Sequence, residues 1–426
     1  MHVYRFIASR FRMGVQPDKD GGRPVSSVST RIGLVSVALS MAVVVVALAV
    51  VIGFRSEIKE KASGFMGEVS LVVPGQSPMN EKYPFSQNAT FLRTFGGDAM
   101  ECLEDLREVD HIQRVAYVSG LLKTEENILG AYFKGVDSLY NFSFFESVLE
   151  EGALPDYRGR ISSDILVSRR MADKMGFVLD STVTAYFIGE EDVKVRKFRI
   201  CGIYDAQLED IDNSLIVADI RQAQRISGWG KDEISTIEVA LKRGVGVDRG
   251  LAAVEQFIFE HGEEDDPSLF STSVKKIFPH LFDWLALLDF NVVIVLLLMI
   301  VVAGFNMISS LLIILFEKTS AIGLLKAMGM TSEGVGKVFR TVALDIIGRG
   351  LVWGNLLAFS LCLVQKYTKI ITLNPENYFV KFVPIAFNIP LIIGVEALCV
   401  VLIMVILRIT TLFIAKVSPD KTMRVS

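Results

Sequence analysis

Long runs of apolar residues alternate with polar segments along this chain of 426 residues. Ile32–Phe54 is apolar and uncharged over 23 residues, and Phe290–Phe316 is the same over 27. Ile389–Leu407 adds 19 residues that are interrupted only by Glu396. As a helix, each run is long enough to cross a hydrocarbon core about 30 Å thick.

A fourth apolar run has a weaker signal. Val338–Leu363 contains Arg340, Asp345 and Arg349, but from Leu351 onward it is almost wholly apolar. Charged side chains near the end of a span can extend to the interface, so this run can also cross. The pattern predicts four transmembrane helices, at residues 32–54, 290–316, 338–365 and 389–414.

The stretch between the first two spans has the pattern of a folded domain outside the membrane. Short strand-like runs alternate with helix-like runs, which predicts a mixed α+β fold for residues 55–289. The predicted strands are Val69–Val73, Arg114–Ser119, Ile128–Val136, Ile165–Val167, Ser181–Ile188, Lys194–Tyr204, Ser214–Val217 and Ile234–Leu241, and the predicted helices are Asp98–Val109, Ser168–Met175, Asp219–Ser227 and Val247–His261.

Both ends of this domain are expected to continue into the spans as helical stalks. Arg55–Lys61 extends the first span, and Leu269–Leu285 is apolar enough to run as a helix straight into the second. Two such stalks would join domain and membrane rigidly, so motion at one end would reach the other.

Charge is unevenly distributed along the chain. Residues 55–289 hold 26 Lys and Arg and 40 Asp and Glu, a net charge of −14. The rest of the chain holds 18 Lys and Arg and 8 Asp and Glu, a net charge of +10, so the whole chain has a net charge of −4. Because Lys and Arg favour the cytoplasmic ends of spans, we expect segments 1–31, 317–337 and 415–426 in the cytoplasm. Residues 55–289 and the loop 366–388 are then outside, although that loop carries Lys366, Lys369 and Lys381. The first span is too long for a cleaved signal peptide and is expected to anchor the chain.

Motifs for catalysis are missing. The sequence has no GxxxxGK[ST], HExxH or GxSxG motif, and among the glycines from Gly329 to Gly336, Val335 stands where a phosphate-binding loop needs lysine. The four histidines lack metal-ligand spacing, and the four cysteines form no CxxC pair. Cys102 and Cys201 could pair, but free thiols are expected. The sequence predicts a protein that is not an enzyme, binds no metal or cofactor and has no nucleic-acid partner.

A short amphipathic segment lies between the second and third spans. It begins at the end of an apolar run and reaches Gly329, which can end a helix in the left-handed conformation. Either it is a plain cytoplasmic hairpin, or a soluble partner docks on it; we favour docking. The residues that would carry such coupling are Glu317, Lys318, Ile322, Leu325, Lys326, Met328 and Gly329.

Several residues inside the spans are candidates for packing or for substrate contact. Asp345 and Arg349 are four residues apart on one helix face, in the favourable order for an ion pair. We interpret them as a structural pair, whereas Glu396 either faces a cavity or is neutral at depth. Gly350 and Gly354 form a GxxxG pattern that permits close helix packing. The remaining candidates are Val43 and Val46, in a β-branched run that could meet acyl chains, and Asn306.

The chain resembles the permease subunits of lipoprotein-releasing ATP-binding cassette (ABC) transporters, the LolC/LolE type within the FtsX/MacB superfamily. The resemblance covers nearly the whole chain. Its most specific part is Ile300–Leu311 followed by Glu317–Lys318 and Ile322–Gly329; further parts are Asp164–Ser168 with Ala172–Gly176, Phe198–Asp205 with Asp212, and the tail Ser418–Arg424. In the segment before the second span, Phe278 to Asp289, only Trp284 matches the family's polar pattern.

The resemblance implies a multi-pass inner-membrane protein of a Gram-negative-type bacterium, with a MacB-like periplasmic domain and both termini in the cytoplasm. It implies a cytoplasmic ABC ATPase dimer that binds ATP and Mg²⁺ and grips residues 317–329. It also implies a second permease chain, lipoprotein cargo, contact with membrane lipid and a periplasmic lipoprotein carrier. Release of lipoproteins by mechanotransmission is the expected function.

Two other functions within the superfamily are alternatives. One is MacB-like efflux of periplasmic peptides or antibiotics. The other is an FtsX-like regulator that moves no substrate and activates a periplasmic cell-wall hydrolase.

Overall fold

The computed structural model describes residues 25–79, 83–88, 92, 102–124, 127–189, 192–261, 266–317 and 328–415. The chain divides into two compact units. The first comprises Met1–Ser56, Leu285–Thr372 and Phe382–Ser426, and the second comprises Glu57–Trp284 and Leu373–Lys381. The second unit is close to the predicted domain 55–289, but it also takes in part of the predicted loop 366–388.

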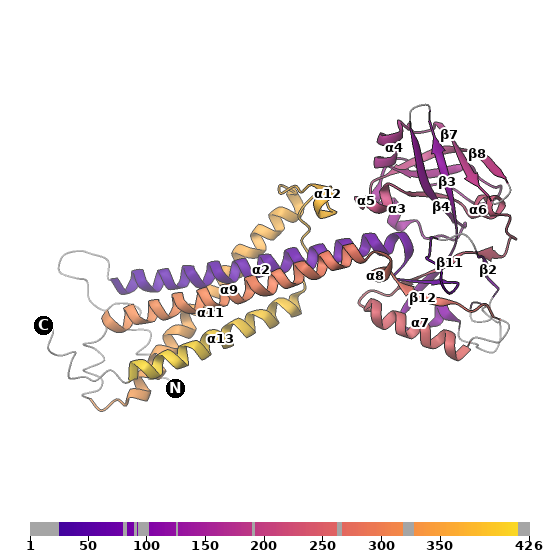
Figure 1. Ribbon diagram of the computed structural model, residues 1–426. Helices are drawn as coiled ribbons and strands as arrows, with labels where there is room; N and C mark the ends of the chain where they lie inside the picture. The colour runs from indigo at the N-terminus through magenta and orange to yellow at the C-terminus, as the bar shows by residue number, and fades with distance from the viewer. Residues whose placement is uncertain are drawn as a thin grey trace. The chain divides into compact units, whose positions relative to one another are not determined.

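Long helices dominate the first unit (Figure 1). They are α2 (Val25–Met66), α9 (Pro279–Glu317), α11 (Ser332–Thr368) and α13 (Ile389–Ala415). Among the described residues, three helices are long and apolar enough to cross a membrane, over Arg31–Met66, Pro279–Val302 and Glu333–Thr368. Helix α13 has a shorter apolar stretch at Ile389–Val405.

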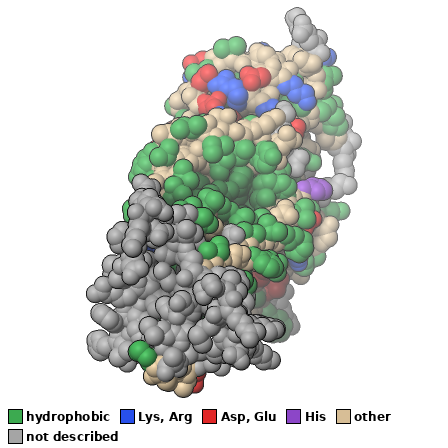
Figure 2. Space-filling view, turned by 90° about the vertical axis from the view of Figure 1, so that its left-hand side faces the viewer, with side chains coloured by type: hydrophobic (Ala, Val, Ile, Leu, Met, Phe, Trp, Pro, Cys, Tyr) green, Lys and Arg blue, Asp and Glu red, His purple; other side chains and the backbone are tan. Residues whose placement is uncertain are grey.

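Many apolar side chains of these helices are exposed, including Leu297, Leu356 and Val401. Figure 2 shows a broad area of hydrophobic side chains on one face. An apolar surface of this kind is stable in contact with lipid and would be costly in water.

Helices α2 and α11 pack closely through two glycines. A Cβ atom on Gly350 would come within 2.6 Å of Val37 Cγ1, and one on Gly354 within 2.6 Å of the Ala38 carbonyl oxygen. Val37 and Met41 of α2 belong to one buried cluster with α11 and α13. The GxxxG pattern therefore serves helix packing within the chain.

The second unit is built on a mixed β-sheet (Figure 1). In the described part of the chain, the main sheet has ten strands in the order β12-β1-β11-β3-β4-β9-β6-β8-β5, with β7 paired to β3 and β8. Strand pairs β4–β9 and β6–β8 are parallel. The strands are β1 (Val69–Val72), β3 (Val109–Lys123), β4 (Ile128–Val136), β5 (Leu149–Gly152), β6 (Asp164–Ser168), β7 (Thr182–Ile188), β8 (Val193–Tyr204), β9 (Leu215–Asp219), β11 (Thr236–Leu241) and β12 (Phe270–Ser273).

Strands β3, β4, β9, β6, β8 and β7 close into a ring of pairings. Phe133 from β4, Phe187 from β7 and Phe198 from β8 pack together in its core, with ring centroids 5.0 to 6.3 Å apart. Helix α6 packs against β3 and β4, and helix α7 against β1 and β12. The smaller elements are β2 (Phe85–Ser86), η2 (Leu103–Asp105), α3 (Ser143–Val148), α4 (Arg169–Met175), α5 (Glu209–Asp212), α6 (Ile220–Ser227), β10 (Glu233–Ile234), α7 (Val247–His261), α8 (Val274–Ile277) and α12 (Pro375–Tyr378).

Two helices begin where the sequence predicted that a strand leads into a helix. The Ser168 hydroxyl accepts a hydrogen bond from Met171 N at the start of α4, and the Asp219 carboxylate accepts one from Arg221 N at the start of α6. Gly176 and Gly228 end these helices with φ of 69° and 78°, a conformation that glycine adopts without strain. Capping residues close in sequence thus determine where α4 and α6 begin and end.

Two predicted helices are wrong. Of Asp98–Val109, the described part holds only the single turn η2, and Val109 already belongs to β3. Leu269–Leu285 is not a continuous helical stalk, because Phe270–Ser273 pairs with β1 and only then do α8 and α9 follow. Pro279 can begin α9 because the first position of a helix needs no N–H donor. The other stalk is as predicted, since α2 continues without interruption to Met66.

Candidate functional site

Most of the predicted ATPase-coupling segment lies outside the described residues. Glu317 is the last residue of α9, and Lys318, Ile322, Leu325 and Lys326 fall in the range that is not described. Met328 is 72% exposed, and Gly329 has a φ of 93°. The left-handed conformation expected of Gly329 is confirmed; docking of a partner stays a prediction.

The candidates inside the spans do not form one site. Asp345 and Arg349 make the expected ion pair, at 3.4 Å, with both side chains partly exposed. Glu396 is half-buried on α13, and its Oε1 atom is among the buried oxygens without a hydrogen bond, as is Oδ1 of Asn355 on α11. Val43 and Val46 are half-buried on α2, and Asn306 lies on α9. A role for any of them in substrate contact stays a prediction.

The structure brings together a different set of residues where the stalk α2 enters the periplasmic-type domain. Lys134, on β4, is fully buried. Its ammonium donates hydrogen bonds to the Phe65 carbonyl oxygen, in the last turn of α2, and to Tyr140 Oη at 3.0 Å. It also forms an ion pair with Glu238 on β11 at 2.7 Å. A lysine at a helix C-terminus satisfies carbonyl groups that have no partner within the helix.

Burial works against both charges of this pair. It lowers the pKa of Lys134 and raises the pKa of Glu238, and the ion pair between them opposes both shifts. Glu238 also accepts a hydrogen bond from Tyr117 Oη at 3.0 Å. Because every charged partner is buried and bonded, separating α2 from the sheet at this point would leave a charge buried without its partner.

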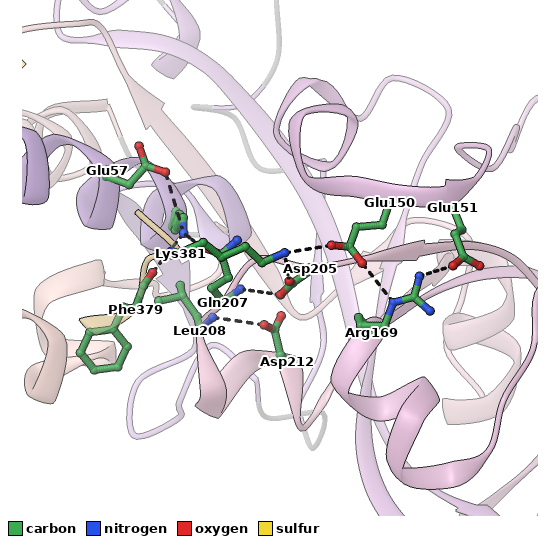
Figure 3. Close-up of polar contacts among 11 residues, drawn as sticks. Glu57, Glu150, Glu151, Arg169, Asp205, Gln207, Leu208, Asp212, Phe379 and Lys381 are labelled. Carbon is green, nitrogen blue, oxygen red and sulfur yellow. Dashed lines mark hydrogen bonds and ion pairs between the residues drawn. The ribbon is translucent and has the colours of Figure 1, made fainter. Parts of the chain in front are cut away.

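A second set of polar contacts lies one turn earlier on α2, around Lys61. Its partners Glu57, Gln207 and Phe379 are labelled in Figure 3. The Lys61 ammonium donates to Gln207 Oε1 at 2.8 Å and to the Phe379 carbonyl oxygen at 3.0 Å. Glu57, four residues before Lys61, lies 3.8 Å from the same ammonium. Lys61 is buried, so a single side chain of the stalk contacts both the domain and the segment that precedes α13.

Lys381 continues this set toward the surface of the domain (Figure 3). Its ammonium lies 2.6 Å from Asp205 and 2.9 Å from Glu150, and its backbone N–H donates to Gln207 Oε1 at 3.2 Å. Arg169, at the start of α4, holds the other oxygen of Glu150 at 3.0 Å. We call these residues the anchor cluster: Glu57, Lys61, Glu150, Arg169, Asp205, Gln207, Asp212, Phe379 and Lys381.

The pKa shifts of Lys381 and Glu150 favour the charged form of each side chain. Burial alone would lower the pKa of Lys381, but hydrogen bonds to Asp205 and Glu150 outweigh it and raise this pKa. Burial alone would raise the pKa of Glu150, but hydrogen bonds from Lys381 and Arg169 outweigh it and lower this pKa. Both groups are therefore charged at neutral pH.

Asp212, the last residue of α5, is the buried acid of the cluster. Its Oδ2 accepts a hydrogen bond from Leu208 N at 3.1 Å, while its Oδ1 is buried without a partner. Burial, together with the negative charge of Asp205, raises the pKa of Asp212 to about 7, although backbone N–H groups lower it in part. This carboxyl group can therefore change its charge near neutral pH.

Sequence reasoning missed most of the anchor cluster. It also missed Lys134, for which a usable signal existed, because this lysine lies among apolar residues inside a predicted strand, between Phe133 and Val136. Lys61 and Lys381 gave no such signal, since their partners are distant in sequence.

Within the described residues, no group of three or more His, Cys, Asp or Glu could hold a metal ion, and Cys102, Cys201, Cys362 and Cys399 are all free. The contacts of Lys134 and of the anchor cluster hold segments of the chain against the domain.

Family models match both halves of the chain. The MacB-like periplasmic core domain matches residues 32–257, and the FtsX-like permease C-terminal domain matches residues 293–419. The chain is 21% identical over 410 residues to the lipoprotein-releasing system transmembrane protein LolC of Xylella fastidiosa, covering 92% of each chain. It is 22% identical over 382 residues to LolC of Neisseria meningitidis serogroup B, covering 84% of this chain and 85% of the relative.

Solved structures are similar to the domain only distantly. The periplasmic region of MacB from Actinobacillus actinomycetemcomitans is 14% identical, with a TM-score of 0.34, and the match covers 53% of this chain and 97% of that one. The extracellular domain of the transporter YknZ from Gram-positive bacteria is 12% identical, with a TM-score of 0.31, covering 48% and 98%. The scores are low, so the family assignment depends on the sequence matches.

The sequence matches cover a periplasmic-type α+β domain and a permease domain, and the apolar helices fit a multi-pass inner-membrane protein. The matched relatives are named as transmembrane proteins of a lipoprotein-releasing system. The chain therefore belongs to the family of permeases that combine a MacB-like periplasmic core domain with an FtsX-like permease C-terminal domain.

Proposed function

We propose that this permease uses ATP hydrolysis by a partner ATPase to release lipoproteins from the inner membrane to a periplasmic carrier. The observation that carries the mechanical part is the continuity of α2 from Val25 to Met66. The same helix serves as a membrane span and ends on the buried ammonium of Lys134. A displacement of α2 is therefore passed directly to the sheet of the domain.

In this proposal the chain crosses the membrane four times, with α13 as the last span and both termini in the cytoplasm. A dimer of ABC ATPases binds residues 317–329 and holds the ATP and Mg²⁺. A second permease chain, identical or paralogous, completes the complex. Carriage of lipoprotein is supported by the names of the distant relatives, which are lipoprotein-releasing proteins.

Energy input is a physical requirement of this function. Each CH₂ group of an acyl chain buried in the bilayer contributes about 0.8 kcal/mol, so removal of a lipid anchor with several chains is strongly unfavourable. The carrier and the ATPase together would supply the compensating free energy.

Depletion of the protein in its host tests the proposal. Inner and outer membranes are separated, and the lipoproteins in each are quantified. We expect lipoproteins to accumulate in the inner membrane, and re-expression of the wild-type chain to restore their distribution.

Normal lipoprotein sorting after depletion would contradict lipoprotein release. Efflux of periplasmic peptides or antibiotics would then be tested by drug sensitivity, and regulation of a cell-wall hydrolase by defects in cell division or shape. The architecture of an ATPase-coupled permease would be unaffected by that result.

A further inference from the structure

The segment Leu373–Lys381 lies in the sequence between α11 and α13, yet it folds with the periplasmic-type domain. Polar contacts hold it there: Lys61 donates to the Phe379 carbonyl oxygen, and Lys381 bonds to Gln207, Asp205 and Glu150. Aromatic contacts add to these, because Trp284 of α9 packs edge-on against Tyr378 and Phe379, with ring centroids 6.5 and 5.6 Å apart. The segment therefore contacts the domain and both stalk helices.

The two attachments in this region differ in how easily they can separate. The Lys134–Glu238 pair is fully buried, so separating its charges would leave an unpaired charge inside the protein. In contrast, the side chains of Lys381, Glu150 and Asp205 are 39%, 34% and 19% exposed. Water can replace the lost contacts of these groups, so their ion pairs can open at low cost.

Two of the four described non-glycine residues with a positive φ lie at the same contact. Gln207 and Phe379 have φ angles of 62° and 58°, in the left-handed region that non-glycine residues rarely adopt. Both residues accept hydrogen bonds from the Lys61 ammonium, Gln207 through its side chain and Phe379 through its carbonyl oxygen. Strained conformations persist only where the surroundings hold them, and they are frequent in switch regions. Movement of Lys61 would release both residues.

We propose that Leu373–Lys381 is a latch: the segment is bound to the periplasmic-type domain in one nucleotide state of the transporter and is released in the other. Lys381 holds the latch closed (Figure 3). Lys61 couples it to the stalk, because displacement of α2 moves this ammonium away from Gln207 and Phe379. The latch extends the proposed coupling to an ATPase, but it does not require that the cargo be a lipoprotein.

Pulsed electron paramagnetic resonance on the complete transporter with its ATPase tests the latch. Spin labels are attached to Asn377→Cys and Val178→Cys, two exposed positions on the latch and on the domain, after replacement of the four native cysteines by alanine. We expect a longer distance in the ATP-bound complex than without nucleotide.

The variant Lys381→Gln keeps a polar side chain, one atom shorter than that of lysine, but removes its charge. We expect its released fraction without nucleotide to rise roughly two- to five-fold, which is the effect of losing exposed ion pairs. Lys366→Gln, at an exposed lysine near the end of α11, is the matched control and should follow the wild type.

A wild-type distance that is the same in every nucleotide state would overturn the latch, and so would a Lys381→Gln variant that behaves as the wild type. The distances are measured without cargo or carrier. Failure of the lipoprotein-sorting experiment would therefore leave this test unchanged.

Discussion

Lys134 shows how one residue can connect a membrane helix to a sheet. Its ammonium caps the last turn of α2 and pairs with Glu238 in the interior of the domain. The desolvation of both charges is costly, so this pair contributes little net stability compared with apolar residues of the same volume. What it does provide is a directional bond to the end of the stalk, which an apolar side chain could not make.

We expect Lys134→Met to destabilise the purified protein by about 3–5 kcal/mol, because Glu238 is left buried without its counter-charge. The double variant Lys134→Met with Glu238→Gln should recover a large part of that loss. Denaturant unfolding followed by tryptophan fluorescence measures both. Lys123→Met, at an exposed position of β3, is the control, and an equal effect at Lys123 would refute the special role of Lys134.

We expect Asp212 to make the folding stability of the domain depend on pH. Its pKa of about 7 lies above the ordinary value of 3.8, so between these values the folded state binds a proton that the unfolded state lacks. Stability therefore falls as pH rises through this window, by at most about 1.4 kcal/mol per pH unit. The contribution of Asp212 to stability is fully present below pH 3.8, its ordinary pKa, and is lost as the pH rises above its pKa of about 7 in the folded state.

We expect Asp212→Asn to weaken this dependence, because the amide carries no charge at any pH. The midpoint of thermal unfolding, measured from pH 5 to pH 8.5, should fall less steeply in the variant than in the wild type. Asp173→Asn, an exposed position on α4, should leave the slope unchanged. Parallel curves for wild type and Asp212→Asn would argue against burial as the source of the effect.

Among the helices, the contact of α2 with α11 depends on the small size of two residues. Gly354 leaves room for the Ala38 carbonyl, and a Cβ atom there would overlap with it. Gly348, on the same helix, has no atom within 4 Å of the corresponding Cβ position. These two glycines therefore form a matched pair that differs only in surroundings.

We expect Gly354→Ala to lower the stability of the detergent-solubilised protein by about 1–3 kcal/mol, the usual cost of overpacking. Gly348→Ala should be neutral or slightly stabilising, because alanine favours a helix more than glycine does. Thermal unfolding distinguishes the two. Equal unfolding midpoints for the two variants would mean that the close contact of α2 with α11 at Gly354 does not contribute to stability.

How well the sequence predicts an element depends on whether its cause is local. The bounds of β4 agree with the prediction, and those of β8 and α4 within a residue, because alternation and capping residues are local signals. The strand β12 escaped prediction because Ser271, Thr272 and Ser273 are polar and become a strand only by pairing with β1. From the sequence, Lys381 is only a lysine that departs from the preference of Lys and Arg for the cytoplasmic side, because its loop is predicted to lie outside. Its partners Asp205 and Glu150 are more than 170 residues away, and sequence pattern alone does not bring them together.

At the scale of the whole molecule, α2 is the element shared by the two units of the chain. It supplies Val37 and Met41 to the packing with α11, and Lys61 and Phe65 to the contacts with the domain. Force applied to the membrane helices can therefore reach the sheet through one continuous helix. The remaining requirement is a point at which the ATPase applies that force, and the amphipathic segment at residues 317–329 is the proposed point.

We expect Leu325→Asp or Lys326→Glu to reduce co-purification of the partner ATPase about tenfold or more, as loss of a central interface residue commonly does. Insertion of the chain into the membrane, assayed by protease accessibility, should be unchanged, because both residues lie between the apolar runs that form the spans. Lys337→Glu is the control: this lysine belongs to the same connection but pairs with Glu333 on α11, so its effect on ATPase binding should be small. If the ATPase co-purified normally with both variants, the docking surface would have to lie elsewhere on the cytoplasmic side. Loss of ATPase co-purification with normal membrane insertion would show that these residues act in ATPase binding and not in folding of the chain, since only the contact that transmits force would have changed.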